Sequence, residues 1–430
     1  MEDLEKTELE IQPKKKFDYN VIIIILCFMS ILFGLGMWGA RSYFTVPVTE
    51  ALGFTRAEFA IVDTMRYVSG AITSLIFGLL IGKFPTKVLL LIGFAFMAIA
   101  AFLFSFTTNL YVFYLGGILY GIGIGLSGTT MMGYIISLVC TKNRGTITGI
   151  VLAANGIGGA IAIQIVTPLI KESTFGYQSA YQALAGIFIA MFVILLILYR
   201  EPHKPEGATV KKKKARGAGW VGISFNEATK KTYFYGACVC IFLTGLCLQG
   251  VGGCKAPHMQ DVGLDLTFIA SVGTVSSLLL TTSKFLNGFL YDRIGLRWTI
   301  TIDCASSVIF MAMLYFINNS LLGMVLCVLI TIFYAIALPL ETVMIPIYAN
   351  DLFGDKSYAK ILGIFSAINQ AGYALGGIII NSIFDAFGSY KIAIVLCGII
   401  MIAVVVFLQF IISSANKVKN QVMLELEQQN

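Results

Sequence analysis

The chain has few charged residues: Asp, Glu, Lys and Arg make up 12% of its 430 residues, against roughly 25% in soluble globular proteins. Hydrophobic residues make up 57%. A water-soluble fold or a disordered chain of this length needs far more charge to face water. The shortage excludes both classes and predicts a protein that lies in a lipid bilayer.

Catalytic and metal-binding patterns are also scarce. There are two histidines, His203 and His258, and we expect both in loops. The nine cysteines show no metal-ligand spacing. No Ser/His/Asp arrangement is visible either, so we expect no enzyme, no metal site and no cofactor.

Long apolar runs fill most of the chain. A helix needs about 20 apolar residues to cross a bilayer core, and runs this long form helices because lipid leaves no backbone polar group unpaired. Twelve runs predict an all-α membrane protein with twelve transmembrane helices. They lie at about residues 21–40, 59–82, 88–107, 110–137, 146–168, 180–199, 233–254, 267–290, 299–317, 321–346, 361–384 and 390–413.

The basic residues sort to one side of this arrangement. If the tails and the even-numbered loops share a side, that side holds 23 of the 30 Lys and Arg residues. The other side holds five, among them Arg41 and Lys255. This positive-inside pattern predicts a multi-pass protein of the cell membrane with both termini in the cytoplasm. The net charge of +7 therefore requires no nucleic-acid partner.

The two halves of the chain resemble each other. Residues 78–83 (GLLIGK) precede the third run, and residues 288–293 (GFLYDR) precede the ninth, 210 positions later. Residues 38–41 (WGAR) have a loose counterpart at 252–255 (GGCK). Two six-helix repeats place a substrate site at their interface, near the membrane midplane. We expect a tail at 1–20, a six-helix half at 21–199, a basic linker at 200–231, a second half at 232–413 and a tail at 414–430.

Glycines recur on single faces of the predicted helices. Residues 123–128 (GIGLSG) match the dinucleotide-binding fingerprint, but they lie inside an apolar span instead of following a strand. Gly117, Gly121 and Gly125 continue the pattern at four-residue spacing. Small residues on one face let neighbouring helices approach closely in lipid, and we interpret the motif as packing.

Some charges fall inside the predicted spans, where each one costs about 2.5–3.5 kcal/mol. Lys284 and Arg66 lie about 12 Å inside their helices at 1.5 Å per residue. Arg41 lies at the outer boundary of the first run or just inside it. Arg and Lys match carboxylates, so Arg41, Arg66 and Lys284 are predicted to bind an anionic substrate.

Two acidic residues accompany these cations. Asp63 is three residues before Arg66 on the same helical face, where a purely structural ion pair is the alternative. Glu341 lies between Pro339 and Pro346, and prolines there imply a broken helix that lines a cavity. Asp63 and Glu341 are candidates for proton coupling or for structural pairing with a buried cation.

Residues 288–297 (GFLYDRIGLR) match in full the loop signature of the major facilitator superfamily. The chain resembles that superfamily, and the resemblance implies its fold of two six-helix halves. It also implies that Asp292, Arg293, Gly295 and Arg297 form a loop that takes part in the conformational switch.

Within the superfamily, the chain resembles the branch of oxalate/formate antiporters and monocarboxylate transporters. The likeness rests on residues 39–42 (GARS), 53–58 (GFTRAE) and 143–145 (NRG), and on Lys284 four residues before the loop signature. It implies that Arg41 and Lys284 bind a carboxylate, with the branch's Lys and Arg exchanged.

Two positions depart from that branch. Leu280 occupies the place of a coupling Asp, and residues 367–370 (AINQ) lack the lysine of oxalate exchangers. Proton coupling would then fall to Asp63 or Glu341, or transport would be an exchange of anions.

The sequence therefore predicts a monomeric secondary active transporter that moves organic anions, most simply monocarboxylates, by alternating access. Its partners are a small organic anion, protons or a counter-anion, and the lipid bilayer. The alternative is a proton-coupled exporter of drugs or other amphiphiles, with Asp63 and Glu341 as cation and proton sites. Ala154 and Asn155 stand where an antiporter motif needs Gly-Pro. A nutrient sensor with this fold is a third possibility.

Overall fold

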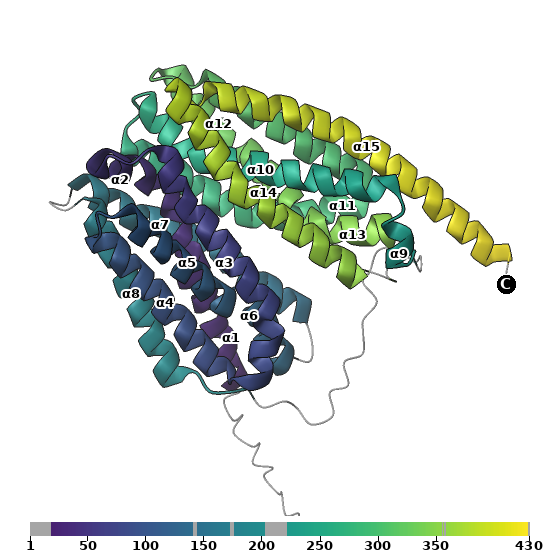
Figure 1. The fold of residues 1–430 in the computed structure, drawn as a ribbon, viewed down its shortest axis with the longest axis horizontal. Coiled ribbons are helices and arrows are strands. Elements are labelled where there is room, and N and C mark those ends of the chain that lie inside the picture. The colour runs from purple at the N-terminus through teal and green to yellow at the C-terminus, as the bar shows by residue number, and fades with distance from the viewer. Residues whose placement is uncertain are drawn as a thin grey trace, which may run out of the picture.

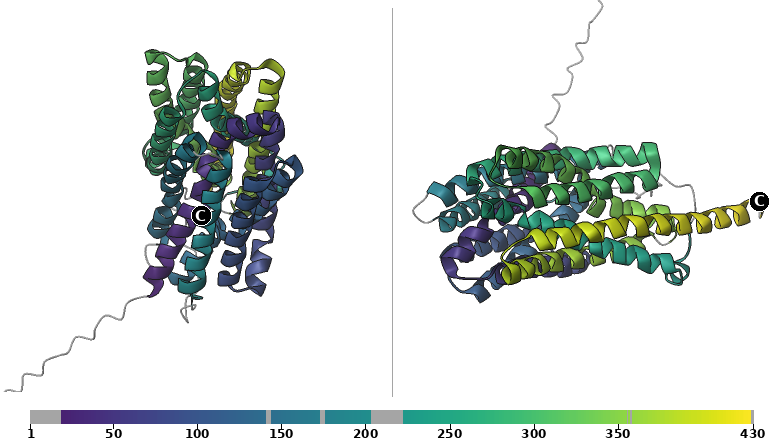
Figure 2. Two further views of the ribbon diagram at one scale, coloured as in Figure 1. Left: turned by 90° about the vertical axis from the view of Figure 1, so that its left-hand side faces the viewer. Right: turned by 90° about the horizontal axis from the view of Figure 1, so that it is seen from above.

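The computed structural model describes residues 19–140, 144–172, 176–202, 222–354, 356 and 358–428. This part of the chain is helical, and the long helices run side by side in two bundles (Figures 1 and 2). Most of the predicted N-terminal tail and of the basic linker lies outside the described residues.

The N-terminal bundle contains α1 (Tyr19–Ser30), η1 (Ile31–Leu35), η2 (Gly36–Phe44), α2 (Thr45–Leu52), α3 (Arg56–Lys83), α4 (Thr86–Phe106), α5 (Leu110–Ser127), α6 (Thr129–Val139), α7 (Arg144–Glu172) and α8 (Tyr177–Leu198). The C-terminal bundle contains α9 (Phe225–Ala228), α10 (Thr232–Asp261), α11 (Leu266–Phe316), α12 (Leu321–Ala337), η3 (Leu338–Glu341), α13 (Met344–Phe353), α14 (Tyr358–Phe387) and α15 (Lys391–Gln428).

The predicted set of twelve spans is recovered in this arrangement. Ten helices among the described residues are long and apolar enough to cross a membrane. One of them, the 51-residue α11, is two helices, because Gly295 at φ 77° and ψ 172° interrupts its helical backbone. The 28-residue α3 adds the remaining span, and its Asp63 and Arg66 reduce its hydropathy.

The first and seventh helices are longer than predicted. The first continues from Tyr19 to Leu52, and α10 ends only at Asp261. Arg41 and Lys255 therefore lie inside helices. Assigning Lys255 to an outer loop was wrong, and Arg41 takes the inner of its two expected positions. His258 was also wrongly expected in a loop: it is buried in α10, with Nε2 3.2 Å from the Leu314 carbonyl oxygen. The apolar runs stop early because these polar side chains face the protein interior instead of lipid.

Close helix packing confirms the interpretation of the glycine pattern. A Cβ atom at Gly117 of α5 would lie 2.6 Å from the Val62 carbonyl oxygen of α3. At Gly123, inside the discarded fingerprint, it would lie 2.6 Å from Cγ of Met97. Helix α3 is thereby held against α5 next to Asp63.

The two halves are joined by charges at one end, which we call the closed end. Arg56 of α3 donates two hydrogen bonds of 2.6 Å to the carboxylate of Asp261 on α10. Asp385 of α14 accepts from the backbone N–H groups of Arg56 and Ala57, at 3.1 and 2.8 Å. A carboxylate at a helix N-terminus is favoured by the helix dipole, so each half supplies a partner for the other.

A second ion pair closes the same end. Lys171 of α7 lies 2.8 Å from Asp265, the N-cap residue of α11. The hydrogen bonds from Lys171 and Thr267 lower the pKa of Asp265 to about 2. A lowered carboxyl pKa means that the stabilising charge is present above the ordinary pKa and is lost only as pH falls towards 2. This pair stays intact at neutral and mildly acidic pH.

The halves separate towards the other end, which we call the open end. Among the described residues, hydrogen bonds between the halves extend no further in this direction than Thr281 of α11, which donates to the Ala153 carbonyl at 3.3 Å. In Figure 1 the halves meet beside α2 and α12, and their far ends diverge towards α1 and α6 in one half and α13 in the other. By the predicted topology, the open end faces the cytoplasm.

Gly117→Ala tests the close packing of α5 against α3. The new Cβ must displace the Val62 carbonyl, and we expect a loss of about 1–3 kcal/mol, seen as a lower melting temperature in detergent. Gly149→Ala in α7 is the matched control, because nothing lies within 4 Å of its Cβ position. Equal melting temperatures for the two variants would show that the contact is unimportant.

Arg56→Ala tests the closure of the closed end. Losing the two-bonded pair with Asp261 should cost the closed state about 1–2 kcal/mol, a factor of about 5–30 in its population. A Ser42→Cys reporter in the cavity should then react correspondingly faster with a membrane-impermeant maleimide added at the closed end. Lys391→Ala, at the same rim, should leave the labelling rate unchanged; an unchanged rate in Arg56→Ala would rule out the gate.

Candidate anion-binding site

A cavity of about 360 Å³ lies between the two halves. Basic side chains from four elements line it: Arg41 from η2, Arg66 from α3, Lys255 from α10 and Lys284 from α11. Glu341 of η3 is the acidic residue of the lining. The structure thus brings together all three predicted substrate-binding residues and adds Lys255.

Asp63 neutralises the cations of the N-terminal half. Its carboxylate lies 2.8 Å from Nε of Arg41 and 3.3 Å from Nε of Arg66. The indole N–H of Trp38 donates to the same carboxylate at 3.0 Å. Two guanidinium groups therefore share one carboxylate, which leaves this cluster with one net positive charge.

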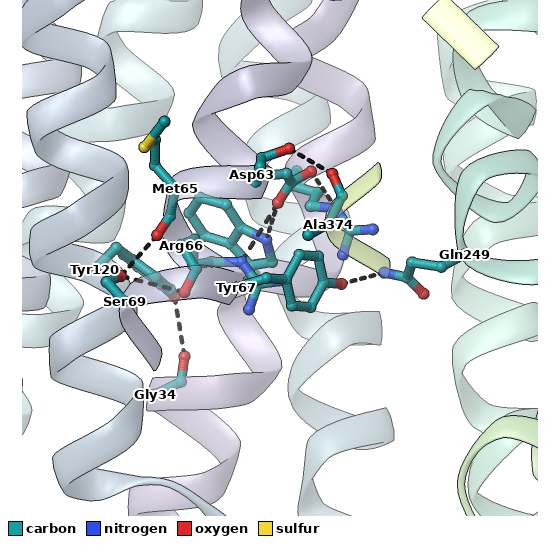
Figure 3. Close-up of polar contacts among 12 residues, drawn as sticks. Gly34, Asp63, Met65, Arg66, Tyr67, Ser69, Tyr120, Gln249 and Ala374 are labelled. Carbon is teal, nitrogen blue, oxygen red and sulfur yellow. Dashed lines mark hydrogen bonds and ion pairs between the residues drawn. The ribbon is translucent and has the colours of Figure 1, made fainter. Parts of the chain in front are cut away.

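Arg66 is held by aromatic rings as well as by Asp63. Its guanidinium lies 3.8 Å from the centroid of the Tyr67 ring and 5.1 Å from that of Trp38. Only 7% of Arg66 is exposed. The Tyr67 hydroxyl accepts a hydrogen bond from Gln249 of the other half, as Figure 3 shows. Arg66 is thus largely a structural part of the wall, and Arg41 is the more accessible of the two arginines.

Lys284 projects from the face of α11 that borders the cavity. Ser276, Ser277 and Leu280 precede it on the same face, at the helical spacing that places them in one stripe. Lys284 forms no ion pair within 4.0 Å among the described residues. A long cationic side chain without an acidic partner is available to an anionic ligand.

Glu341 lies where the tenth span is broken. The structure has a 3₁₀ segment, Leu338–Glu341, between α12 and α13, as the flanking prolines predict. Glu341 is 4% exposed, and its Oε2 has no hydrogen-bond partner among the described residues. Its backbone carbonyl accepts from Asn369 and Tyr373 of α14, at 3.1 and 3.0 Å. The backbone at Glu341 is therefore held in place, while one oxygen of its buried carboxyl group is left without a hydrogen bond from the described part of the chain.

Lys255 is the cavity residue that the sequence interpretation missed. Its Nζ lies 3.4 Å from the ring centroid of Tyr334, in a cation–π contact. The signal was present in the sequence, because residues 252–255 are the internal counterpart of residues 38–41, which end in Arg41. Counting Lys255 as an outer-loop charge removed it from consideration.

The predicted switch loop lies away from the cavity, at the open end. Asp292, Arg293, Gly295 and Arg297 are all exposed. Arg293 lies over the ring of Phe289 in its own helix, and Arg297 donates a 2.8 Å hydrogen bond to Gln409 of the same half. In this conformation these side chains make no hydrogen bond or ion pair with described residues of the other half.

The described residues contain no group of three or more His, Cys, Asp or Glu side chains that could hold a metal ion. Their chemistry is instead that of ion pairing: guanidinium and ammonium groups around a cavity between the halves suit a carboxylate or another small anion.

Comparison with known proteins adds three findings. The sequence model of the Major Facilitator Superfamily matches residues 26–340 and 237–424. The sialic acid transporter NanX of Escherichia coli is 22% identical over 282 residues, 64% of this chain and 66% of that protein. This match spans just under two thirds of the length of NanX.

Two further curated relatives match more of the chain. An uncharacterized MFS-type transporter of E. coli, YhjX, is 24% identical over 80% of this chain and 83% of its own. The nitrite extrusion protein of Bacillus subtilis is 23% identical over 85% of this chain and 87% of its own.

Solved structures share the fold. The crystal structure of the nucleoside transporter NupG has a TM-score of 0.72 at 15% identity, covering 91% of this chain and 98% of its own. A bacterial homolog of the human lysosomal transporter Spinster, in an inward-facing and unoccupied conformation, has a TM-score of 0.71 at 15% identity, covering 95% and 99%.

Proposed function

Because the chain belongs to the major facilitator superfamily, we propose that it is an alternating-access carrier of organic anions, most simply monocarboxylates, in the cell membrane. The observation that supports this is the charge of the cavity, whose lining contains the basic residues Arg41, Arg66, Lys255 and Lys284 and the acidic residue Glu341. Asp63 compensates one of the two arginines. Cations in a membrane interior are costly unless they serve a partner, and an anionic substrate supplies one.

The names of two relatives agree with this substrate class. NanX is a sialic acid transporter, and the B. subtilis relative is a nitrite extrusion protein. Sialic acid is a carboxylic acid, and nitrite is an inorganic anion, so both proteins handle negative charge. We extend only that common property to this chain.

The substrate carboxylate binds between Lys284 of one half and Arg41 of the other. Lys284 has no ion pair among the described residues that a substrate would have to break. Arg41 uses Nε to bind Asp63, which it shares with Arg66, so the other nitrogens of its guanidinium are available to a ligand. Binding neutralises charges that face each other across the cavity, which favours closure of the open end around the ligand. The pairs of the closed end then separate, and the site opens to the other side.

Glu341 is the proton site in this proposal. Its unpaired Oε2 is buried beside the substrate position, where two carboxylates would repel each other, so a proton enters with the anion. Lys284, Arg41, Tyr334 and Tyr373 are the charged and titratable groups that act on it. Asp63 is less suited to this role, because three donors already occupy its carboxylate.

The same arrangement weakens the alternative of a drug exporter. A cationic drug needs a carboxylate with free charge, and Asp63 is shared by two arginines. Glu341 remains, but four basic side chains line the space around it. We therefore favour the anion carrier.

Lys284→Ala tests the substrate site. Losing a charged hydrogen bond of about 1.5–3 kcal/mol should raise KM for carboxylate uptake into proteoliposomes about ten- to hundredfold. Lys230→Ala removes an exposed lysine at the linker and should leave KM unchanged. Unchanged KM in both Lys284→Ala and Arg41→Ala would contradict the proposed site.

Glu341→Gln tests proton coupling. The amide cannot carry the proton, so an inward proton gradient should no longer drive accumulation, while exchange of labelled for unlabelled substrate continues. Wild-type uptake should rise as external pH falls, and this dependence should be lost in the variant. Proton-driven accumulation by Glu341→Gln would show that the coupling lies elsewhere or that transport is exchange.

A further inference from the structure

We propose that Lys255 forms a second anion-binding position, near the closed end of the cavity, which receives the organic anion from the outer side before Lys284 binds it. This inference rests on the proposed anion transport. It assigns to Lys255 a role distinct from that of Lys284, because the two lysines lie at different depths in the same cavity.

The depth of each lysine follows from its helix. Lys255 is six residues from Asp261, the end of α10, or about 9 Å at 1.5 Å per residue. Lys284 is 18 residues from Leu266, the start of α11, or about 27 Å. These two helix ends lie together at the closed end, so the backbone positions of the two lysines differ in depth by about 18 Å. Lys255 therefore belongs to the closed-end part of the cavity and Lys284 to its inner part.

Lys255 has no acidic partner among the described residues. Its ammonium lies over the Tyr334 ring, and that ring is fixed by Phe310, at 5.2 Å between centroids in an edge-on contact, and by close packing of the Tyr334 hydroxyl on Gly252. An aromatic face holds a cation in place but leaves its charge uncompensated. The ammonium is thereby positioned to bind an anion.

The intervening wall continues the basic surface. Arg41 lies 11 residues from Leu52, the end of α2, or about 16 Å from the closed end. It acts electrostatically on Tyr334, whose ring carries Lys255, and on Glu341, which is also under the influence of Lys284. Lys255, Arg41 and Lys284 therefore mark three successive depths along one cavity.

The gate of the closed end lies about 9 Å further along α10 than Lys255. Asp261, six residues further along α10, pairs with Arg56 of the other half. When the halves separate here, that pair is broken and the space above Lys255 is opened. Among the described residues that line the cavity, Lys255 is then the cation without an acidic partner that an anion from the closed end meets first, whereas an anion from the open end meets Lys284 first.

The two positions predict a sided effect that a structural role of Lys255 would not produce. In right-side-out membrane vesicles, Lys255→Gln should raise KM for external carboxylate about tenfold, because it loses one charged contact. In inside-out vesicles, KM for the same anion presented at the cytoplasmic side should stay within about twofold of wild type. Lys255→Arg, which keeps the charge, should restore most of the external affinity.

Lys391→Gln is the control, because it removes an exposed lysine from the same rim of the protein. If Lys255→Gln does not fold, Lys255→Met is used instead, because it also removes the charge and keeps an unbranched side chain. Equal changes on both sides, or no change on either, would overturn the second position.

Different experimental results would contradict this inference and the proposed function. If wild type transports carboxylates and Lys284→Ala impairs this transport, while Lys255→Gln has no sided effect, only the role of Lys255 is wrong. If wild type moves no organic anion from either side, both are wrong.

Discussion

An excess of positive charge in a low-dielectric cavity is the constraint on which the site depends. Four basic side chains from both halves line one space, and Asp63 compensates only those of the N-terminal half. In the C-terminal half, the ammonium of Lys255 contacts the aromatic ring of Tyr334. Lys284 interacts with Glu341 at longer range, without an ion pair. Burying ions without partners is costly, and a bound anion relieves that cost.

The closed end is built to open. Its ion pairs join helix tips of opposite halves, Arg56 with Asp261 and Lys171 with Asp265. The exposed Lys171–Asp265 pair contributes little to stability, so the buried Arg56 guanidinium and its two hydrogen bonds contribute most of the closure. The buried cluster around Asp63 lies within one half and has no reason to break during a rocking motion. The protein thus places separable ion pairs between the halves where they must part, and keeps the charges that shape the site within one half.

Hydropathy and the internal repeat were sufficient to predict the fold, because twelve apolar segments in two similar sets admit few arrangements. The same method failed at the ends of the first and seventh helices. Polar side chains that face a cavity interrupt an apolar run as effectively as a loop does, so Lys255 and His258 were placed outside the membrane. Arg41 was predicted to lie in the substrate site only because of the resemblance to carboxylate transporters.

Which charged residues pair with each other could be learned only from the three-dimensional structure. The Asp63–Arg66 pair follows from helical spacing, but the addition of Arg41 and Trp38 to the same carboxylate depends on how η2 packs beside α3. The broken helix at Glu341 could be predicted from Pro339 and Pro346; that its Oε2 lacks a partner could not. Sequence spacing determines neighbours on one helix, whereas a cavity is made of residues from several.

The most direct measurement compares organic acids with their primary amides, which have nearly the same shape but no charge. Binding to purified protein would be measured by the shift in melting temperature over a series of ligand concentrations. If the cavity selects negative charge, the acids that bind should stabilise the protein, and their amides should bind at least tenfold more weakly, about 1.4 kcal/mol. Equal stabilisation by acid and amide would contradict an anion site between Arg41 and Lys284.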